Sequence, residues 1–279
     1  MTSVNEIKKI GVIGAGTMGG GIAQVFALYD YGVVLVDTEE AILQKAVEKL
    51  KKFTDPDLWE KVSSLIVTST DLEKLKDCEL IIEAVFEDIS VKKEVFKSIN
   101  CVCKKTAIIA TNTSSISINK LATEVTDTSR FIGMHFMNPP KVMKLVEIIR
   151  GKKTSEETVE AIKELTKRLD KIPAVVNDSP GFVSNRLLFA LIGEAIKLLE
   201  NGVSTREDID TVMKHGMNHP MGPIKLADFI GLDVCLDIMQ VLYDNLNDDR
   251  YKPSQLLEIL VRDGKLGKKT GEGFYKYDV

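Results

Sequence analysis

Short apolar runs alternate with amphipathic stretches through the first half of the chain. Residues 10–13 form the first apolar run, which ends in glycines, and residues 17–29 then place apolar side chains at helical spacing. A second apolar run, residues 33–36, stops at Asp37. This pattern predicts a strand, a tight turn, a helix and a second strand, with the strands buried on both faces.

The same alternation continues further along the chain. Apolar runs typical of buried strands recur at residues 80–82, 107–110 and 131–134, and helical patterns occupy residues 41–53 and 89–99. Strands that alternate with helices predict a parallel sheet with right-handed crossovers. We therefore expect an α/β fold in the first part of the chain, with a doubly wound, mostly parallel sheet of the Rossmann type.

The pattern changes after residue 180. Helical spacing of Leu, Ile, Ala and Glu then dominates, over residues 181–201, 205–214, 228–246 and 253–263. A turn-rich segment, residues 177–181, separates the two patterns. The sequence thus predicts two domains, an α/β domain over residues 1–178 and an all-helical domain over residues 179–279.

Composition and charge narrow the class of protein. The 279 residues include 37 basic and 41 acidic side chains, with a formal net charge of -4, and 44% are hydrophobic. This apolar content excludes a disordered chain, and the near-balanced charge argues against a dedicated nucleic-acid-binding protein. No apolar run approaches the ~20 residues that span a bilayer, and the first residues show no signal-peptide pattern. We expect a cytoplasmic protein with neither a nucleic-acid nor a membrane partner.

The spacing of cysteines and histidines does not support a metal site. Four cysteines are too few for a disulfide scaffold, and Cys101 and Cys103 lie too close in sequence for the usual zinc spacing. His215 and His219 stand four residues apart, which suits zinc on one helix face, but no third ligand accompanies them. We expect free thiols and no bound metal.

A glycine-rich turn follows the first predicted strand. Its sequence is Gly14-Ala15-Gly16-Thr17-Met18-Gly19, a G-x-G-x-x-G pattern. In such a loop the first glycine permits the turn, the second lets the backbone approach a pyrophosphate, and the third lets helix and strand pack closely. The pattern alone is weak, but here it lies between a predicted strand and a predicted helix. This context predicts a dinucleotide-binding site.

Asp37 indicates which dinucleotide is bound. It ends the second predicted strand, 18 residues after Gly19. A carboxylate at this place accepts hydrogen bonds from the adenosine ribose hydroxyls but repels a 2′-phosphate, and the following Thr38-Glu39-Glu40 has no arginine to hold such a phosphate. The sequence therefore favours NAD over NADP.

A histidine and a glutamate are predicted to meet across two strands. His135 follows the apolar run at residues 131–134, just before a turn, and the chain returns through residues 141–149, which include Glu147. If the two segments form adjacent strands, Glu147 lies beside His135, and a carboxylate that orients an imidazole is a common way to build a general base. The residues alone leave a second interpretation open, a core histidine with a surface glutamate.

Polar residues at two further places are candidates for substrate contact. Residues 111–115 follow an apolar run, at the strand ends where open α/β sheets bind ligands, although Ser115 or Ser117 could cap the next helix. Asn185 and Arg186 follow the turn-rich segment by a few residues. They either project towards the cleft or form a solvated pair.

The motifs together resemble the L-3-hydroxyacyl-CoA dehydrogenase family, and within it the short bacterial and archaeal 3-hydroxybutyryl-CoA dehydrogenases. The matching segments occur in the family's order, at residues 14–19, 112–115, 133–139, 178–186, 218–223 and 271–275. The resemblance implies a reversible, NAD-dependent oxidation of a short-chain (S)-3-hydroxyacyl-CoA, such as 3-hydroxybutyryl-CoA, to a 3-oxoacyl-CoA such as acetoacetyl-CoA. It implies a role in fatty-acid metabolism, and the sequence leaves open whether the pathway is fatty-acid breakdown, fermentation or autotrophic carbon fixation.

The resemblance also assigns roles to individual residues. His135 would be the catalytic base, and Glu147 would be its partner. Ser114 and Asn185 would hydrogen-bond the oxygens of the substrate and help to seat the nicotinamide. Further contacts with the dinucleotide are expected from Glu87, Lys92, Asn138 and Lys269. Lys92 would in addition reach the acyl-CoA.

The segment after Asp37 departs from the family's pattern. It is shorter than the helical hairpin that relatives carry there. Where relatives tend to have a serine and a lysine for the CoA moiety, this chain has Phe53 and five lysines, Lys45, Lys49, Lys51, Lys52 and Lys61. The sequence leaves open which of these lysines bind CoA, and with them the preferred acyl-chain length.

The second domain has more apolar surface than a small helical core needs. The residues that carry this excess are Leu226, Phe229, Ile230, Leu232 and Val234. In the resembling family such helices form a dimer contact, so we expect a homodimer through the C-terminal helical domain.

Other functions remain compatible with parts of the sequence. A β-hydroxyacid dehydrogenase of the 6-phosphogluconate type shares the glycine loop but relies on a lysine in its cleft. A branch that includes gulonate dehydrogenase and a lens crystallin shares the His–Glu pair and acts on a free hydroxy acid. A non-catalytic dinucleotide-binding protein would be expected to lack one of Ser114, His135, Glu147 or Asn185, and all four residues are present.

Overall fold

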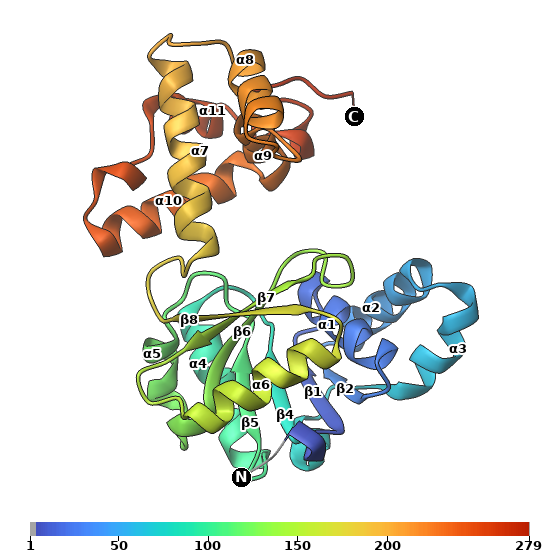
Figure 1. Cartoon of the computed structure of the whole chain (residues 1–279). Helices are drawn as coiled ribbons and strands as arrows, with labels where there is room; N and C mark the ends of the chain where they lie inside the picture. The colour runs from blue at the N-terminus through green and yellow to red at the C-terminus, as the bar shows by residue number, and fades with distance from the viewer. Residues whose placement is uncertain (1–3, 279) are drawn as a thin grey trace. The chain divides into compact units, whose positions relative to one another are not determined.

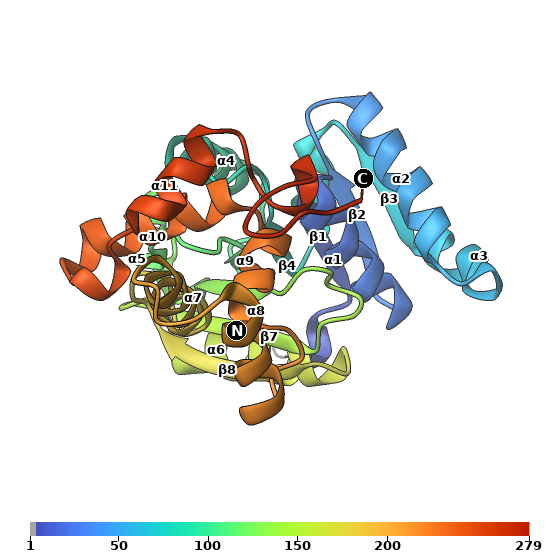
Figure 2. The ribbon, with the colours of Figure 1, turned by 90° about the horizontal axis from the view of Figure 1, so that it is seen from above.

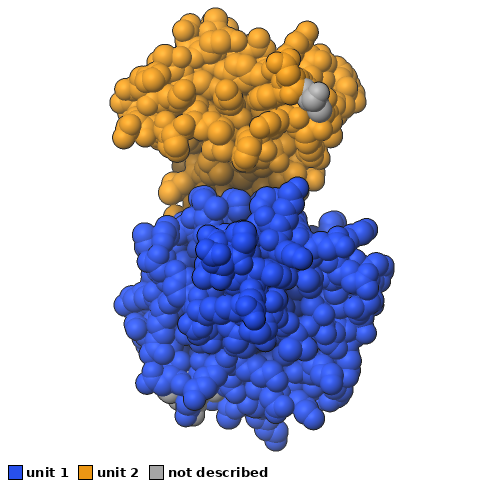
Figure 3. All heavy atoms as spheres, turned by 90° about the vertical axis from the view of Figure 1, so that its right-hand side faces the viewer, with its two compact units in different colours: residues 1–178 blue, residues 179–279 orange. Residues whose placement is uncertain are grey.

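The chain folds into two compact units. The computed structural model describes residues 4–278, and the division falls between Asp178 and Ser179. Unit 1 comprises residues 1–178 and unit 2 comprises residues 179–279, and Figure 3 draws them in different colours.

A single sheet forms the centre of unit 1 (Figure 1). Its strands are β1 (Lys9–Ile13), β2 (Gly32–Val36), β3 (Ile66–Ser69), β4 (Leu80–Glu83), β5 (Ile108–Thr111), β6 (Phe131–Phe136), β7 (Leu145–Arg150) and β8 (Ile172–Asn177). They lie in the order β3-β2-β1-β4-β5-β6-β7-β8 across the described part of unit 1, and only the pair of β6 and β7 is antiparallel. The predicted Rossmann-type, mostly parallel sheet is confirmed.

Helices cover both faces of this sheet. They are α1 (Thr17–Leu28), α2 (Glu40–Phe53), α3 (Pro56–Leu65), α4 (Ile89–Val102), α5 (Ile118–Leu121) and α6 (Glu156–Arg168). Figures 1 and 2 show α1 and α6 on one face and α4 on the other. Apolar residues of α1 and α6 pack with the strands in one core, in which Phe26 and Ile162 are fully buried. Because the helices hold the sheet from both sides, the strand ends are fixed supports for polar side chains.

The structure contains a helix and two strands that the sequence pattern did not predict. A second helix, α3, follows α2, and Asp55 caps it by accepting a hydrogen bond from the backbone of Asp57. The sheet is extended at its edges by β3 and by β8, whose Pro173 is tolerated because this is an edge strand. These edge strands are short or partly exposed, so their apolar pattern is weak.

Unit 2 is helical, as predicted. Its helices are α7 (Ser184–Glu200), α8 (Arg206–Thr211), α9 (Pro223–Ile230), α10 (Leu232–Leu246) and α11 (Gln255–Arg262). The buried face of α7 carries Phe189, Ile192 and Ile196, which pack against α9 and α10 in one core. This alternation of a buried and an exposed face is the reason that the sequence pattern revealed the helices.

The predicted helix over residues 228–246 is wrong, because two helices occupy that region. Gly231 separates α9 from α10 and has a φ of 107°, a left-handed conformation that interrupts the helix. Leu232, expected on the surface, is fully buried, whereas Phe229 is 62% and Val234 39% exposed.

The boundaries of α7 and α8 also differ from the predicted ranges. Helix α7 begins at Ser184 and not at residue 181, since Gly181 and Phe182 have φ of 70° and 51°. A π-helix, Val212–Gly216, follows α8. None of the helices within residues 4–278 combines the length and the hydropathy that a membrane crossing requires.

Candidate active site

The glycine loop joins β1 to α1 in a conformation that only glycine allows. Gly14 has a φ of 96°, and a Cβ on it would lie 2.6 Å from the carbonyl oxygen of Ala84. A Cβ on Gly19 would lie 1.7 Å from the carbonyl oxygen of Gly14. The first and third glycines of the motif are therefore required by the close packing of strand and helix.

The second glycine has a different environment. Gly16 is the N-cap of α1, so no side chain satisfies the first amides of that helix from the cap position. A Cβ on Gly16 would meet no atom within 4 Å. Open space beside the N-terminus of a helix is a place where a pyrophosphate can accept backbone hydrogen bonds. The residues present thus fit a dinucleotide.

Asp37 lies directly beside this loop. Its Oδ2 accepts a hydrogen bond from the backbone N–H of Ala15 at 2.6 Å, and its Oδ1 accepts one from the N–H of Thr38 at 2.7 Å. The carboxylate at the end of β2 therefore stands next to the glycine loop, where the ribose of a dinucleotide is expected.

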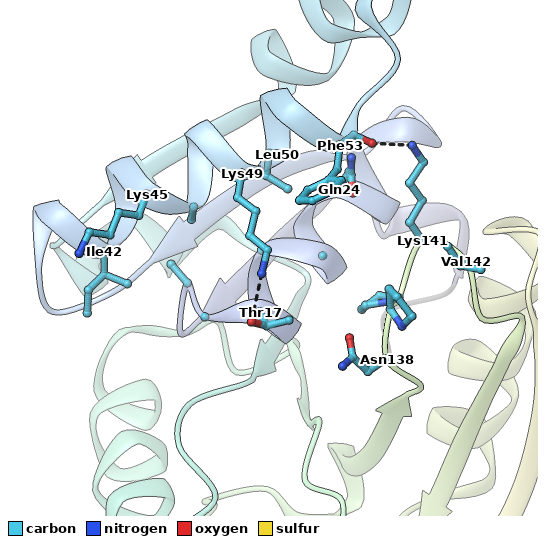
Figure 4. Close-up of a pocket in the computed structure, with 17 residues that line it drawn as sticks. Thr17, Gln24, Ile42, Lys45, Lys49, Leu50, Phe53, Asn138, Lys141 and Val142 are labelled. Atoms are coloured by element: carbon cyan, nitrogen blue, oxygen red, sulfur yellow. Dashed lines mark hydrogen bonds between the residues drawn. The ribbon is translucent and has the colours of Figure 1, made fainter. Parts of the chain in front are cut away.

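A pocket of about 590 Å³ opens between α1, α2 and the segment that follows β6 (Figure 4). Its apolar lining includes Ile42, Leu50, Phe53 and Val142. Its lysines are Lys45, Lys49 and Lys141. Of the five lysines that the sequence left as alternatives for CoA, Lys45 and Lys49 thus line the pocket, whereas Lys51, Lys52 and Lys61 are not among its lining residues.

Two of these lysines are held at defined places. Figure 4 shows Lys49 reaching from α2 towards the glycine loop, where its Nζ lies 3.2 Å from the hydroxyl oxygen of Thr17. Lys141 Nζ donates to the carbonyl oxygen of Phe53 at 2.8 Å, at the end of α2. Asn138 also lines the pocket, close to the start of the same segment.

His135 and Glu147 face each other across β6 and β7. They are register partners in the antiparallel pair, and His135 Nδ1 lies 3.0 Å from Glu147 Oε2. Both residues are buried, with exposures of 7% and 2%. The predicted juxtaposition is confirmed, and the alternative of a surface glutamate is wrong. In the neutral imidazole beside an ionised Glu147, Nδ1 is the donor to the carboxylate and Nε2 is the acceptor nitrogen.

The backbone around His135 is tied to the end of β5. Asn112 follows that strand, and its Oδ1 accepts a hydrogen bond from the backbone N–H of Phe136 at 2.9 Å. The loop that carries Ser114 and the strand that carries His135 are therefore held together, at the carboxyl end of the parallel strands.

Glu87 organises the loop that carries Ser114. Its Oε1 accepts hydrogen bonds from the hydroxyl of Thr113 at 2.6 Å and from the backbone N–H groups of Ser114 at 2.8 Å and Ser115 at 3.1 Å. Burial works to raise the pKa of the Glu87 carboxyl, but the charge of Lys92 and these hydrogen bonds outweigh it, and the pKa lies below its ordinary value. Glu87 is thus an ionised acceptor at neutral pH.

Sequence reasoning predicted Lys92 as a site residue but missed Glu83, the carboxylate that pairs with it. Lys92 is 1% exposed, and its Nζ lies 2.7 Å from Glu83 Oε1 and 3.2 Å from Glu87 Oε2. Glu83 ends β4 and has no exposed surface. A signal was available, because a glutamate that directly follows the buried apolar run of residues 80–82 needs a charged or hydrogen-bonded partner.

The remaining predicted site residues belong to unit 2. Asn185 lies in the first turn of α7, and Arg186 beside it donates to the hydroxyl oxygen of Ser179 at 3.3 Å. Lys269 pairs with Asp233, its Nζ 2.6 Å from both carboxylate oxygens.

The serine-rich segment after β5 serves a capping role at one position. Ser117 caps α5 by accepting a hydrogen bond from the N–H of Lys120, as one interpretation of the sequence held. Ser115 instead contacts Glu87 through its N–H and its hydroxyl.

Metal-binding residues do not cluster within residues 4–278. No group of three or more His, Cys, Asp or Glu side chains is placed to hold an ion there. His215 lies in the π-helix, and His219 lies in the turn before α9.

Comparison with known proteins covers both units. Residues 9–179 match the NAD-binding domain of 3-hydroxyacyl-CoA dehydrogenase, and residues 181–277 match the C-terminal domain of the same family. The chain is 50% identical to a probable 3-hydroxybutyryl-CoA dehydrogenase of Deinococcus radiodurans, over 96% of this chain and 100% of that protein. It is 45% identical to the 3-hydroxybutyryl-CoA dehydrogenase of Clostridioides difficile, over 97% of this chain and 99% of that one.

A solved structure agrees with these relatives. The (S)-3-hydroxybutyryl-CoA dehydrogenase of Ralstonia eutropha superposes with a TM-score of 0.94 at 44% identity, and the match covers 98% of this chain and 100% of that one. The glycine loop with Asp37 fits the cofactor of the matched NAD-binding domain. The chain is an NAD-dependent oxidoreductase and belongs to the 3-hydroxyacyl-CoA dehydrogenase family.

Proposed function

We propose that this enzyme oxidises short-chain (S)-3-hydroxyacyl-CoA, with 3-hydroxybutyryl-CoA as its substrate, to the 3-oxoacyl-CoA in a reversible reaction. The observation that carries the proposal is the buried pair of His135 and Glu147, 3.0 Å apart at the end of β6. Relatives that span nearly the whole chain have 3-hydroxybutyryl-CoA dehydrogenase in their names, which supports the same substrate class.

His135 is the general base of this mechanism. Its Nδ1–H is directed at Glu147, so Nε2 receives the proton of the substrate hydroxyl during oxidation and returns it during reduction. The Glu147 carboxylate holds the ring in this tautomer and stabilises the positive charge that forms on it. General acid–base catalysis of this kind contributes about 10²- to 10⁴-fold to the rate.

The glycine loop and Asp37 hold the dinucleotide. The amides at the start of α1 donate to the pyrophosphate, and the Asp37 carboxylate accepts from the adenosine ribose hydroxyls. When bound, NAD supplies the hydride acceptor. Ser114 and Asn185 orient the oxygens of the substrate, while the nicotinamide end is contacted by Glu87, Ser114, Asn138 and Lys269. Alignment of the substrate carbon with the cofactor is the main contribution of these residues.

The pocket beside α2 receives part of the CoA moiety. Its apolar lining suits an extended organic chain. The positive ammonium groups of Lys45, Lys49 and Lys141 attract negatively charged phosphates. Lys45 and Lys49 are therefore the lysines of α2 that we assign to CoA.

The enzyme acts as a homodimer through unit 2. Phe229 is 62% exposed on α9, and Val234 and Val241 are each 39% exposed on α10. Apolar side chains gathered on two consecutive helices suit a self-complementary contact. Size-exclusion chromatography with light scattering should give twice the chain mass of 30.9 kDa, and a particle of a single chain mass at micromolar concentration would contradict the dimer.

Oxidation of NADH by acetoacetyl-CoA tests the proposed reaction. The purified enzyme is assayed with acetoacetyl-CoA and, in parallel, with free acetoacetate, and NADPH replaces NADH as a control. We expect rapid turnover with the thioester and NADH alone. Absence of turnover with the thioester would falsify the assignment, and a preference for the free acid would favour the hydroxy-acid branch.

Replacement of His135 tests its role as the base. His135→Ala should lower kcat by about 10²- to 10⁴-fold while NADH binding, followed by fluorescence, is retained. His215→Ala is the matched control, because His215 is exposed in unit 2. If kcat survives in the His135 variant, this histidine is structural and another base must be sought.

A further inference from the structure

A buried cluster of charges lies behind the loop that carries Ser114. Lys92 donates to Glu83 at 2.7 Å, to Glu87 at 3.2 Å and to the carbonyl oxygen of Val85 at 3.4 Å. An ammonium group has three hydrogens, so its donors are matched by these three acceptors inside unit 1. With the side chain 1% exposed, this ammonium is directed at its own protein and not at solvent.

Glu83 is the fixed end of this cluster. Its Oε1 also accepts from the N–H of Val85 at 2.7 Å, and its Oε2 accepts from the hydroxyl of Thr111 at 2.7 Å. It therefore joins the end of β4 to the end of β5 and to the turn that follows β4. Glu83 is fully buried and both of its oxygens accept hydrogen bonds from the protein. The position of its carboxylate therefore determines where Lys92 Nζ lies.

Glu87 connects the Glu83–Lys92 pair to the loop that carries Ser114. Its two oxygens face different partners, since Oε2 lies towards Lys92 and Oε1 accepts from the backbone of Ser114 and Ser115. A carboxylate is planar, so the position of one oxygen determines the direction of the other. Lys92 thereby aims Oε1 at the loop, and Oε1 is also 3.2 Å from the Ser114 hydroxyl oxygen.

We propose that the Glu83–Lys92 ion pair positions Ser114 for the reaction, acting through Glu87. On this view Lys92 is a positioning residue. Without Glu83, Lys92 has Glu87 as its remaining charged partner and draws that carboxylate away from the loop. The proposal rests on the proposed function only for the contact between Ser114 and substrate.

Amide hydrogen exchange tests the relay independently of activity. In Glu83→Gln, the backbone N–H groups of Ser114 and Ser115 should exchange at least ~10-fold faster than in the unchanged protein, as followed by NMR. Glu79→Gln is the matched control, because Glu79 precedes the same strand at its opposite end and pairs with Lys104 at 2.7 Å. The proposal is overturned if the exchange rates of Ser114 and Ser115 are unchanged in Glu83→Gln. It is also overturned if Glu79→Gln raises these rates by the same factor.

A double-mutant cycle separates positioning from general destabilisation. Glu83→Gln alone should lower kcat with acetoacetyl-CoA by about 10- to 100-fold, since a displacement of ~1 Å is enough for such a loss. In a Ser114→Ala background the same substitution should have almost no further effect on kcat. If the two substitutions lower kcat by independent factors that multiply in the double variant, Glu83 does not act through Ser114, and the proposal is overturned.

A second variant replaces the other partner of the ion pair. Lys92→Met removes the ammonium and leaves Glu87 without its anchor, so the same rise in exchange and the same lack of additivity with Ser114→Ala are expected. This variant decides the question if Glu83→Gln does not fold. Should the unchanged enzyme fail to reduce acetoacetyl-CoA, the proposed function fails, while hydrogen exchange still shows whether the relay exists.

Discussion

The Asp37 carboxylate and the backbone nitrogen of Ala15 lie 2.6 Å apart, so the residue expected to distinguish NAD from NADP also holds the glycine loop. Its second oxygen accepts from the N–H of Thr38, which fixes the plane of the carboxylate. One side chain at the end of β2 therefore has two roles: it holds the glycine loop in place, and it supplies the negative charge at the ribose site. These two roles can be separated by substitution.

Asp37→Asn should relax the choice of cofactor without disturbing the loop. The amide oxygen can still accept from Ala15, although the amide NH2 cannot accept from the Thr38 N–H as Oδ1 does, and the negative charge that repels a 2′-phosphate is lost. We expect the ratio of kcat/KM for NADH over NADPH to fall by about 10-fold or more, the loss of one repulsive charge contact. Asp37→Ala also removes the acceptor, so its KM for NADH should rise above that of the Asn variant. Equal KM values for both variants would show that the contact with Ala15 is unimportant.

The second and third glycines of the motif, Gly16 and Gly19, should respond differently to an added methyl group. In Gly16→Ala the Cβ meets no atom within 4 Å, so the melting temperature should change little, while NADH binding weakens because the methyl group takes the space of the pyrophosphate. In Gly19→Ala the Cβ would lie 1.7 Å from a carbonyl oxygen, which should destabilise the fold by about 1–3 kcal/mol or more. Calorimetry of both variants, with NADH titrations, checks this contrast. Unchanged NADH affinity in Gly16→Ala would place the pyrophosphate elsewhere.

Glu147→Gln should reduce catalysis while it leaves the strand pair intact. The amide keeps the shape of the side chain, but it removes the charge that stabilises protonated His135 and allows the ring to adopt the wrong tautomer. We expect kcat to fall by about 10²-fold or more, with a small change in the KM for NADH. Glu164→Gln, at an exposed position of α6, serves as the control for the loss of one carboxylate. A kcat within twofold of the unchanged enzyme would mean that Glu147 only fills the core.

The pairing of His135 with Glu147 could be predicted because it depends on local patterns. Two apolar runs separated by a turn predict adjacent strands. A polar side chain buried within each run needs a hydrogen-bond partner, and the other polar side chain is the nearest one. Asp37 could be predicted for the same reason, since its position is determined by the end of one strand. The break at Gly231 could not, because an isolated glycine in an apolar helical pattern is compatible with both a continuous and a divided helix.

Contacts that depend on how the elements pack against one another could not be predicted from the sequence alone. Glu83 and Lys92 lie on different elements, and their pairing depends on how α4 packs beside the end of β4. The lysines near CoA posed a similar problem, because helical spacing does not decide which face of α2 turns towards the pocket. That choice depends on α1 and on the segment of Asn138 to Val142, which line the other walls.

The four cysteines should differ sharply in their reactivity, because burial controls both access and thiolate formation. Cys101 is exposed, whereas burial raises the pKa of Cys78 to about 11 and that of Cys235 to about 12. Cys103 is half-buried, and burial raises its pKa as well. Ellman's reagent at pH 8 should therefore titrate Cys101 first, Cys103 more slowly, and the other two only after unfolding.

Mass spectrometry of the labelled protein identifies the sites. Cys101→Ser should remove the fast phase of labelling and leave the total after denaturation lower by one thiol. Rapid modification of Cys78 or Cys235 in the folded protein would show that the core around these thiols opens readily, which their complete burial does not lead us to expect.

Glu87 should make the stability of unit 1 dependent on pH in the acid range. Its folded pKa is lowered, since the charge of Lys92 and the hydrogen bonds of residues 113–115 outweigh the cost of burial. A carboxylate of this kind contributes stability above its ordinary pKa, and the contribution is lost as the pH falls through the lower, folded value. The free energy of unfolding of Glu87→Gln should thus lie below that of the unchanged protein at pH 7, and the difference should shrink as the pH falls below about 4.5. Urea titrations across this range measure the difference, and Glu60→Gln on the exposed side of α3 controls for the loss of one negative charge. A difference that stays constant, or that grows as the pH falls, would mean that the ionised form of Glu87 does not stabilise the loop of Ser114.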